Sequence, residues 1–469
     1  MSAPARVPIV IVAGVASGVG KTTVTLAVVE ALRRRGLSVQ PFKVGPDFID
    51  PGFHALASGR PSPTLDGWMC GRDHALAAVA RHAGAADLAV VEGMMGCFDG
   101  ADAGSEVGST AEMAKWLGAP VVLVLDAGAL ARSAAAVVLG FERFDAGLAV
   151  AGVIFNRAGG AAHRRGLAAA VGERCRARPL GALPRAPEIE LPERYLGLAT
   201  AAEGGYTEAL GERLARLAEA HLDLDALIGL ATSGVGRTPA GLENAALKRR
   251  DVRIGVARDP AFQFYYPENL ERLEAAGAEI VTWSPITHAA LPDVDGLYLG
   301  GGYPELHAPA LAANEAMRAA VREFSESGRP IYAECGGLMY LAEAIVTADG
   351  RAWPMVGLMP SRVTMAGARL AIGYREVETT APGPLGPAGV RGRGHEFHAS
   401  ALDPHVPASV RRLYAVGDRD RGPRRTEGYA VGNTLMSYVH LHFGSAPAMA
   451  ESLVAACRRP AATTGAPAR

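Results

Sequence analysis

A cysteine lies at an abrupt turn in the stretch GRPIYAECGGLMYL, residues 328–341. An apolar run ends in Glu334 and Cys335, and two glycines follow before the apolar pattern resumes. A strand that turns sharply into a helix through glycine can expose a nucleophile at the tip of the turn. The sequence therefore predicts that Cys335 is a nucleophile, and the alternative is a buried structural thiol, which is common for free cysteines.

A second glycine-rich stretch could serve that thiol. GLYLGGGYPE places Gly300, Gly301 and Gly302 directly after an expected strand. Their N–H groups could form one half of an oxyanion hole, and the N–H of Gly336 would form the other half.

A nucleophilic thiol also needs a base. SYVHLHF offers His440 and His442, which alternate along an expected strand and so face the same side. GHEFH offers His395 and His398. The residue pattern alone leaves the choice among these four histidines open.

The other chemical motif is near the start of the chain. IVAGVASGVGKTTVTLAVVEAL joins a strand to a helix through a glycine-rich loop, which is the context of a phosphate-binding loop. Loop N–H groups can cradle phosphate oxygens, Lys21 can reach the β- and γ-phosphates, and the Thr22 hydroxyl can hold Mg²⁺. We predict an ATP-binding set of Gly18, Val19, Gly20, Lys21, Thr22, Thr23 and Asn156, although helix capping is the alternative for Asn156.

The spacing of this loop separates two classes of nucleotide-binding protein. Its upstream glycine is Gly14, one residue further away than in the common Walker pattern, and the loop resembles that of dethiobiotin synthetases and related ligases. Dimeric switch ATPases of the partitioning type carry a second lysine where this chain has Ala16. The loop therefore favours a synthetase over a switch.

Acidic residues follow two further expected strands. KVGPDFIDPGFH contains Lys43, Asp47 and Asp50, and LAVVEGMMGCFDG contains Glu92. Carboxyl ends of parallel strands line the ligand crevice of an open sheet, so we expect these side chains near Lys21. We predict an Mg²⁺ shell of Thr22, Asp47 and Glu92, and substrate contacts from Lys43 and Asp47. Such a cluster suits phosphoryl transfer to a substrate oxygen, and we place Asp50 beside that oxygen. Turn formation is the alternative for the aspartates.

The elements that must hold these residues are those of an α/β protein. Short apolar runs alternate with amphipathic stretches, which predicts a parallel sheet covered on both faces. After a polar, glycine-containing stretch, a second αβ series opens at VRIGVARD. We predict an ATP- and substrate-binding domain over residues 1–230, a linker over 231–252, a thiol domain over 253–457 and a flexible tail over 458–469.

Composition narrows the function further. The chain has 469 residues and a formal net charge of −1, so no global field attracts nucleic acid or an anionic membrane. Its five cysteines are odd in number and lack a C-x-x-C pair, which argues against a disulfide framework and a zinc site. The first residues resemble a β-strand rather than a signal peptide, so we expect a cytoplasmic protein and leave a homodimer open.

Both halves resemble one family. GGYPELHA, YAECGGLMYL and YVH are similar to the class I glutamine amidotransferase domain of corrinoid amidases, and KVGPDFIDPGFH with VEGMMGCFDG resembles their ATP-binding half. The resemblance runs from about Val7 to Ser452 and points to the cobyrinate or hydrogenobyrinate a,c-diamide synthases. It implies that Cys335 attacks the amide carbon of glutamine, that His440 assists, and that ATP converts two ring carboxylates into acyl phosphates for amidation in cobalamin biosynthesis.

Two positions depart from the expected family pattern. Most class I glutaminases carry His-x-Glu, whereas this chain has His440-Leu441-His442, so His442 could replace the usual carboxylate. Tyr195 stands where the family usually has histidine. The alternatives are a diamide synthase for another tetrapyrrole, such as nickel-sirohydrochlorin, or an ATP-dependent switch with a vestigial glutaminase domain.

Overall fold

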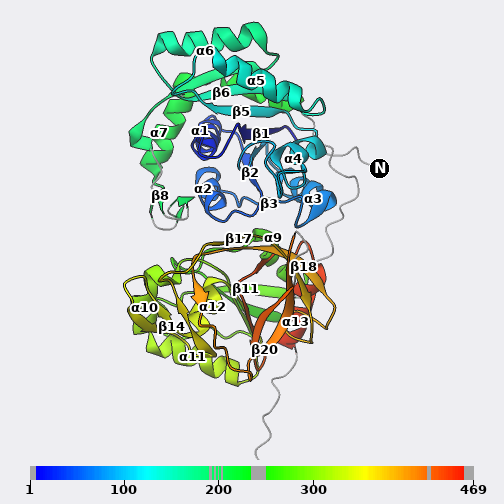
Figure 1. Cartoon of the computed structure of the whole chain (residues 1–469), viewed down its shortest axis with the longest axis vertical. Helices are drawn as coiled ribbons and strands as arrows, with labels where there is room; N and C mark the ends of the chain where they lie inside the picture. The colour runs from blue at the N-terminus through cyan, green and yellow to red at the C-terminus, as the bar shows by residue number, and fades with distance from the viewer. Residues whose placement is uncertain are drawn as a thin grey trace, which may run out of the picture. The chain divides into compact units, whose positions relative to one another are not determined.

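The computed structural model describes residues 7–189, 193–194, 197–198, 200–201, 204–233, 250–419 and 424–458. The chain divides into two compact units, Met1–Glu243 and Asn244–Arg469, and Figure 1 labels many of their elements. Within the predicted linker, residues 231–233 continue a helix and 234–249 lie outside the described residues. Tyr195 and the tail after residue 458 also lie outside them, so the predicted domain limits stay predictions.

The first unit alternates strands with helices. Its strands are β1 (Ile9–Gly14), β2 (Val39–Val44), β3 (Thr64–Leu65), β4 (Leu88–Glu92), β5 (Val121–Asp126), β6 (Val150–Ala158), β7 (Arg178–Pro184), β8 (Glu193–Arg194) and β9 (Gly197–Leu198). Its helices are α1 (Lys21–Arg34), α2 (Ile49–Ser58), α3 (Gly71–Ala83), α4 (Thr110–Leu117), α5 (Ser133–Phe144), α6 (Ala161–Arg174), α7 (Glu208–His221) and α8 (Leu224–Ser233). The main sheet has the order β3-β2-β4-β1-β5-β6-β7 with parallel neighbours, as predicted.

Both faces of this sheet are covered. Along β1, Ile9 and Ile11 pack into one apolar core with α3, α4, α5 and α6. The alternate residues Val10 and Val12 pack into another core with α1, α2, α7 and α8. Since successive strand residues point to opposite faces, a strand buried on both sides must be apolar throughout, and IVIVAG is. The doubly covered sheet is therefore confirmed.

The second unit combines a parallel and an antiparallel part. Its strands are β10 (Val252–Ala257), β11 (Ala278–Trp283), β12 (Gly296–Leu299), β13 (Ile331–Glu334), β14 (Ala342–Val346), β15 (Ala352–Pro354), β16 (Met359–Thr364), β17 (Ala371–Thr379), β18 (Arg391–His398), β19 (Ala401–Leu402), β20 (Arg411–Asp418), β21 (Arg425–Val431), β22 (Thr434–Ser437) and β23 (His440–Leu441). Its helices are α9 (Pro267–Ala275), α10 (Ala308–Ala313), α11 (Glu315–Glu326), α12 (Gly336–Leu341) and α13 (Pro447–Arg458).

The largest sheet of this unit changes character at β22. In its order β11-β10-β12-β13-β22-β21-β20-β17-β18-β23, neighbours are parallel as far as β22 and antiparallel beyond it. The parallel part is the second αβ series that the sequence predicts. The antiparallel ribbon was not part of that prediction, and its last strand carries His440.

Local signals explain where the helices of this unit begin. Pro267 occupies the first turn of α9, where its missing N–H would have no partner in any case. The Asn314 side chain accepts the N–H of Met317 and caps α11. None of the helices in the described part of the chain is long and apolar enough to cross a membrane.

Candidate active sites

The glycine-rich loop joins β1 to α1, as the predicted phosphate-binding loop requires. Gly18 and Gly20 have φ values of 76° and 90°, a region that favours glycine. A Cβ at Gly20 would lie 2.1 Å from the Asn156 side-chain nitrogen. Asn156, at the end of β6, donates from that nitrogen to the Val19 carbonyl at 2.9 Å. The structure thus places Asn156 beside the loop, and its hydrogen bond to Val19 stabilises the loop conformation.

Lys21, the first residue of α1, points back over the loop. Its Nζ donates to the Met95 carbonyl at 2.6 Å and to the Ala16 carbonyl at 3.3 Å. Met95 itself adopts a left-handed backbone, with φ of 46°, just after β4. Burial, and next the charge of Lys43, lower the pKa of Lys21. The ammonium therefore rests on neutral carbonyl acceptors, and anionic phosphate oxygens are stronger partners for it.

The predicted acidic residues meet around Lys43, whose side chain is only 3% exposed. Its Nζ lies 2.5 Å from Asp50 Oδ2, 2.9 Å from Glu92 Oε1 and 3.6 Å from Asp47 Oδ2. Lys43 and Glu92 are direct partners in the parallel pairing of β2 with β4. Burial by itself would lower the pKa of Lys43, but the charges of Asp50 and Glu92 outweigh it and raise that pKa. Lys43 is thus the cationic centre of this cluster.

Glu92 connects the cluster to the phosphate loop. Its Oε1 accepts the Thr22 hydroxyl at 2.8 Å, and its Oε2 lies 2.7 Å from His54 Nε2. Burial alone would raise the pKa of Glu92, but Lys43 and His54 hold it below the usual range. Sequence reasoning missed His54. The available signal was its spacing, because it follows Asp50 by four residues on α2 and so shares its face.

The oxygen atoms of this cluster suit a hard divalent cation. Thr22 offers a hydroxyl, and Asp47 and Glu92 offer carboxylates, which are ligands that Mg²⁺ prefers. Asp47 Oδ1 accepts the N–H groups of Ile49 and Asp50 at 2.8 and 3.1 Å at the start of α2. This leaves Asp47 Oδ2 directed toward Lys43, so the residues present fit the predicted Mg²⁺ shell.

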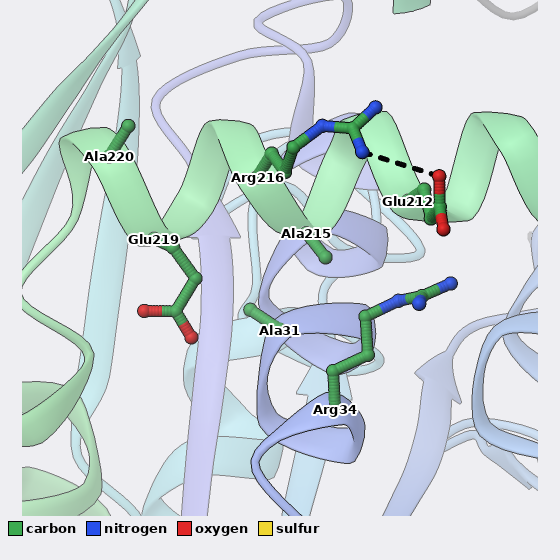
Figure 2. A pocket seen from close by; sticks show the side chains of 7 residues that line it. All are labelled: Ala31, Arg34, Glu212, Ala215, Arg216, Glu219 and Ala220. Atoms are coloured by element: carbon green, nitrogen blue, oxygen red, sulfur yellow. Dashed lines mark hydrogen bonds and ion pairs between the residues drawn. The ribbon is translucent and has the colours of Figure 1, made fainter.

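A groove of about 590 Å³ elsewhere in the first unit is not part of this site. Figure 2 shows it between α1 and α7, with Arg216 paired to Glu212 along one wall. Its lining is Ala31, Arg34, Glu212, Ala215, Arg216, Glu219 and Ala220. Ala31 follows Lys21 by ten residues on one helix, which places it about 15 Å further along the axis at 1.5 Å per residue.

The predicted thiol lies at a strained turn between β13 and α12. Cys335 has φ of 47° and ψ of −102°, an unfavourable backbone for a residue with a side chain. Its N–H donates to the Ser437 carbonyl at 2.7 Å, which ties the turn to the end of β22. Burial, and next the charge of Glu305, raise the pKa of Cys335. The thiol is therefore protonated at rest and needs a base before it can attack.

The oxyanion glycines lie beside this turn. A Cβ at Gly336 would be 3.0 Å from the Gly302 nitrogen, so these two glycines are neighbours. Gly302 has φ of 154°, and a Cβ there would lie 2.1 Å from the Ala261 carbonyl oxygen. Gly301 differs because its N–H donates to the Phe264 carbonyl at 3.3 Å. The N–H groups of Gly302 and Gly336 are thus better placed to bind an oxyanion than that of Gly301.

His440 packs against the same glycine loop. A Cβ at Gly301 would lie 2.3 Å from His440 Cε1, and the His440 ring stacks on His395 with 5.1 Å between centroids. Burial, and next the charges of His395 and His398, lower the pKa of His440. A neutral imidazole can accept the proton of a neutral thiol. The glycine loop therefore brings the Cys335 turn and His440 together.

The other three histidines have different surroundings. His395 Nδ1 lies 2.7 Å from the Tyr266 hydroxyl, and His398 Nδ1 lies 3.0 Å from the Ser400 carbonyl. His442 Nε2 is 4.0 Å from Glu268 Oε2, a carboxylate at the start of α9. The position of the His440 ring against Gly301, in the loop beside the Cys335 turn, favours His440 as the base.

Sequence reasoning also missed Glu334, the residue before the thiol. Its carboxylate accepts the hydroxyls of Tyr332 at 2.5 Å and Tyr298 at 2.8 Å, and the N–H of Leu441 at 2.9 Å. Burial raises the pKa of Glu334 to about 7, although these donors oppose it. The available signal was an acidic residue in an otherwise apolar strand, IYAE. Such a residue needs buried partners.

Comparisons with known proteins match both units. A model described as the CobQ/CobB/MinD/ParA nucleotide binding domain matches residues 10–198, and one described as the CobB/CobQ-like glutamine amidotransferase domain matches residues 253–448. A solved glutamine amidotransferase covers 44% of this chain and 98% of its own at 20% identity, with a TM-score of 0.30, too low to support a conclusion.

Relatives that span nearly the whole chain carry one name. The chain is 47% identical over 462 residues to the cobyrinate a,c-diamide synthase of Syntrophotalea carbinolica. The aligned region covers 96% of this chain and 99% of that protein. Its identity to the protein of the same name from Salmonella typhimurium is 42% over 454 residues, covering 96% and 98%. For the Archaeoglobus fulgidus protein it is 41% over 453 residues, again covering 96% and 98%.

Proposed function

The chain belongs to the cobyrinate a,c-diamide synthase family, and from that premise we propose that it is a glutamine-hydrolysing, ATP-dependent ligase. Its substrate is cobyrinate or hydrogenobyrinate, and its product is the a,c-diamide. The names of relatives that match 96% of the chain support this substrate. The charged cluster in one unit and the thiol turn in the other support a division into carboxylate activation and ammonia production.

The thiol unit releases ammonia from glutamine. His440 takes the proton of Cys335, and the sulfur attacks the amide carbon of glutamine. The resulting oxyanion is bound by the N–H groups of Gly302 and Gly336. As it collapses, His440 returns the proton to the amide nitrogen, the C–N bond breaks, and ammonia leaves behind a thioester. Water then hydrolyses the thioester to glutamate and restores the thiol. The strained Cys335 backbone supports this role, because such strain is concentrated at active sites, where the surrounding structure fixes an unfavourable backbone conformation.

The nucleotide unit activates the ring carboxylate. Backbone N–H groups of the loop and the Lys21 ammonium hold the phosphates of ATP, and an oxygen of the ring carboxylate attacks the γ-phosphate. ADP leaves, and an acyl phosphate forms. Thr22, Asp47 and Glu92 would hold Mg²⁺, which neutralises charge on the transferred phosphoryl group.

Amide formation completes the reaction. Ammonia attacks the acyl phosphate carbon, phosphate leaves, and the nitrogen loses a proton to give the amide. The same sequence of steps on the second carboxylate gives the diamide. Lys43 and Asp50 lie beside Glu92, and we assign them to the orientation of the ring carboxylate. The observation that carries the proposal is the Lys43 cluster bonded directly to the phosphate loop through Glu92 and Thr22.

The test supplies purified protein with MgATP, glutamine and either cobyrinate or hydrogenobyrinate in parallel. Product masses show whether two carboxylates become amides, and which ring is preferred. We expect glutamate release to rise when both ATP and the ring acid are present. A protein that hydrolyses glutamine at the same rate with and without these substrates, and leaves the ring acid unchanged, would refute the proposal.

A further inference from the structure

The strand that carries the base is short. β23 contains only His440 and Leu441, and one of its edges pairs with β18 through His395 and Gly394. Toward the opposite side, the Leu441 N–H donates to Glu334 Oε1 at 2.9 Å, and the Leu441 carbonyl accepts from Asn269 Nδ2 at 2.7 Å. Side chains therefore bind the backbone groups of Leu441 where a neighbouring strand would otherwise bind them.

Glu334 links this strand to the nucleophile. It is the last residue of β13 and directly precedes Cys335, while its backbone pairs with Ser437 of β22. Its side chain crosses to Leu441, which is the residue after His440. Glu334 is thus adjacent in sequence to the thiol residue, and its side chain is hydrogen-bonded to the backbone of the residue that follows the base.

The Glu334 carboxylate is itself held in place. The Tyr332 hydroxyl donates to Oε1 at 2.5 Å and the Tyr298 hydroxyl donates to Oε2 at 2.8 Å. Tyr298 and Tyr332 are fully buried and stack with 5.3 Å between their centroids. With the Leu441 N–H, three donors orient two oxygens, so the carboxylate has a single favourable placement.

Asn269 of α9 binds the same segment from another element. Its Nδ2 donates to the Leu441 carbonyl, and its Oδ1 accepts the Phe443 N–H at 2.7 Å. Asn269 therefore binds Leu441 within the base strand and Phe443 just beyond it. We call Glu334 and Asn269 together the base clamp.

We propose that the base clamp positions His440 for proton transfer from Cys335 and that Glu334 is a positioning residue of the glutaminase site. The residue two after His440 is His442 rather than a carboxylate, and the base clamp binds the backbone of the strand that carries the imidazole. Stability alone does not call for this arrangement, because buried ionic groups can often be replaced by apolar ones without loss. This inference rests on the proposed glutaminase function of Cys335 and His440.

The experiment compares variants of the full-length enzyme in amidation driven by glutamine and by free ammonia. Glu334→Leu keeps an apolar side chain of similar size but removes the acceptor for the Leu441 N–H. We expect its glutamine-dependent kcat to fall about a hundredfold, since displacement of a catalytic group by about 1 Å costs that much. KM for glutamine and the ammonia-dependent rate should stay close to those of the parent, because neither depends on proton transfer at Cys335.

Two further variants separate positioning from general support of the fold. Glu334→Gln retains an acceptor oxygen for Leu441 and should restore most of the glutamine-dependent kcat. Ser325→Ala is the matched control, because it also removes a buried side-chain hydrogen bond from the same unit. The Ser325 hydroxyl lies 2.7 Å from that of Thr434, which is on β22, the strand that precedes the base in the chain. It should leave both rates unchanged.

The outcomes are distinguishable. Glu334→Leu with parent-like glutamine-dependent kcat would overturn the inference, as would equal loss in the Leu and Gln variants with ammonia-dependent synthesis intact. If Glu334→Leu does not fold, Asn269→Ala decides: a selective loss of glutamine-dependent kcat supports the clamp, and an unchanged rate overturns it. Cys335→Ser is run beside them, because a Cys335→Ser enzyme that still uses glutamine would refute the proposed function rather than the clamp alone.

Discussion

The two sites solve opposite electrostatic problems. Around Lys43, the effect of burial on the pKa values is offset by neighbouring groups of opposite charge, which keep the lysine cationic and Glu92 anionic. Around Cys335, burial raises the pKa of the thiol and lowers that of His440, so both groups rest neutral. Phosphoryl transfer needs fixed charges ready for the charge that develops, whereas the thiol site needs a neutral pair that exchanges one proton.

The two sites also differ in how the chain assembles them. Lys43 and Glu92 come from the carboxyl ends of adjacent parallel strands, as the general geometry of α/β sheets requires. Cys335 lies at a similar strand end, but His440 arrives on the last strand of an antiparallel ribbon. Residues at the ends of parallel strands can be predicted from the sequence pattern to lie at one edge of the sheet. The pattern does not predict where the last strand of a long antiparallel ribbon lies.

The largest effect should come from removing the thiol. Cys335→Ser should lower glutamine-dependent synthesis by at least about a thousandfold, as loss of a nucleophile commonly does. Free ammonia at high concentration should still support diamide formation, because the charged site is untouched. The measurement is the product mass with each nitrogen source. Loss of both activities would break the comparison by showing that Cys335 also supports the nucleotide site.

Removing the Lys21 side chain should lower the rate of synthesis equally with glutamine and with ammonia as the nitrogen source. The residue is assigned to the β- and γ-phosphates, and removing such a positioned charge costs roughly a hundredfold or more in rate. Lys21→Ala should therefore depress synthesis with glutamine and with ammonia to the same extent, measured as ADP release and diamide yield. Ammonia-dependent synthesis at the parent rate would place ATP use elsewhere.

Neutralising Asp50 should give a smaller loss confined to carboxylate activation. Asp50→Asn keeps the shape of the side chain beside Lys43 but removes its charge, and we expect a fall of about tenfold in synthesis, as for a group that assists rather than performs transfer. ATP binding, measured by calorimetry, should stay nearly intact. A monoamide should accumulate, because the reaction must run twice on one ring. A parent-like rate of diamide formation would contradict this assignment.

The smallest effect is expected at the second histidine of the ribbon. His440→Ala should reproduce the Cys335→Ser phenotype, while His442→Ala should reduce glutamine-dependent kcat only a few-fold. His442 is directed to Glu268 at 4.0 Å, whereas the His440 ring lies against the oxyanion loop. Paired kinetics of the two variants sharpen the comparison. Equal collapse at His442 would show that the thiol is served by a different base.

Many residues of both sites could be predicted because they form motifs of residues that lie close together in the sequence. The glycines, Lys21 and Thr22 of the phosphate loop follow one another directly, and a strand, a cysteine and two glycines define the elbow. Asp47, Asp50 and Glu92 were grouped by a rule about strand ends, and the structure does bring them to Lys43. The role of Lys43 as their common partner was not foreseen, since a pattern of residue types does not say where a flexible side chain ends.

The sequence by itself determined the two α/β units, the phosphate loop and the position of the thiol, because each depends on hydrophobic periodicity or on residues a few positions apart. The tertiary structure alone decided that Gly302 lies beside Gly336 and that the His440 ring lies against Gly301. It also decided that Glu334 bonds to Leu441, 107 residues further along the chain. The physical reason is that this contact forms only after the strands of the antiparallel ribbon have paired and brought β23 beside β13. The local sequence around Glu334 or around Leu441 does not encode such long-range pairing.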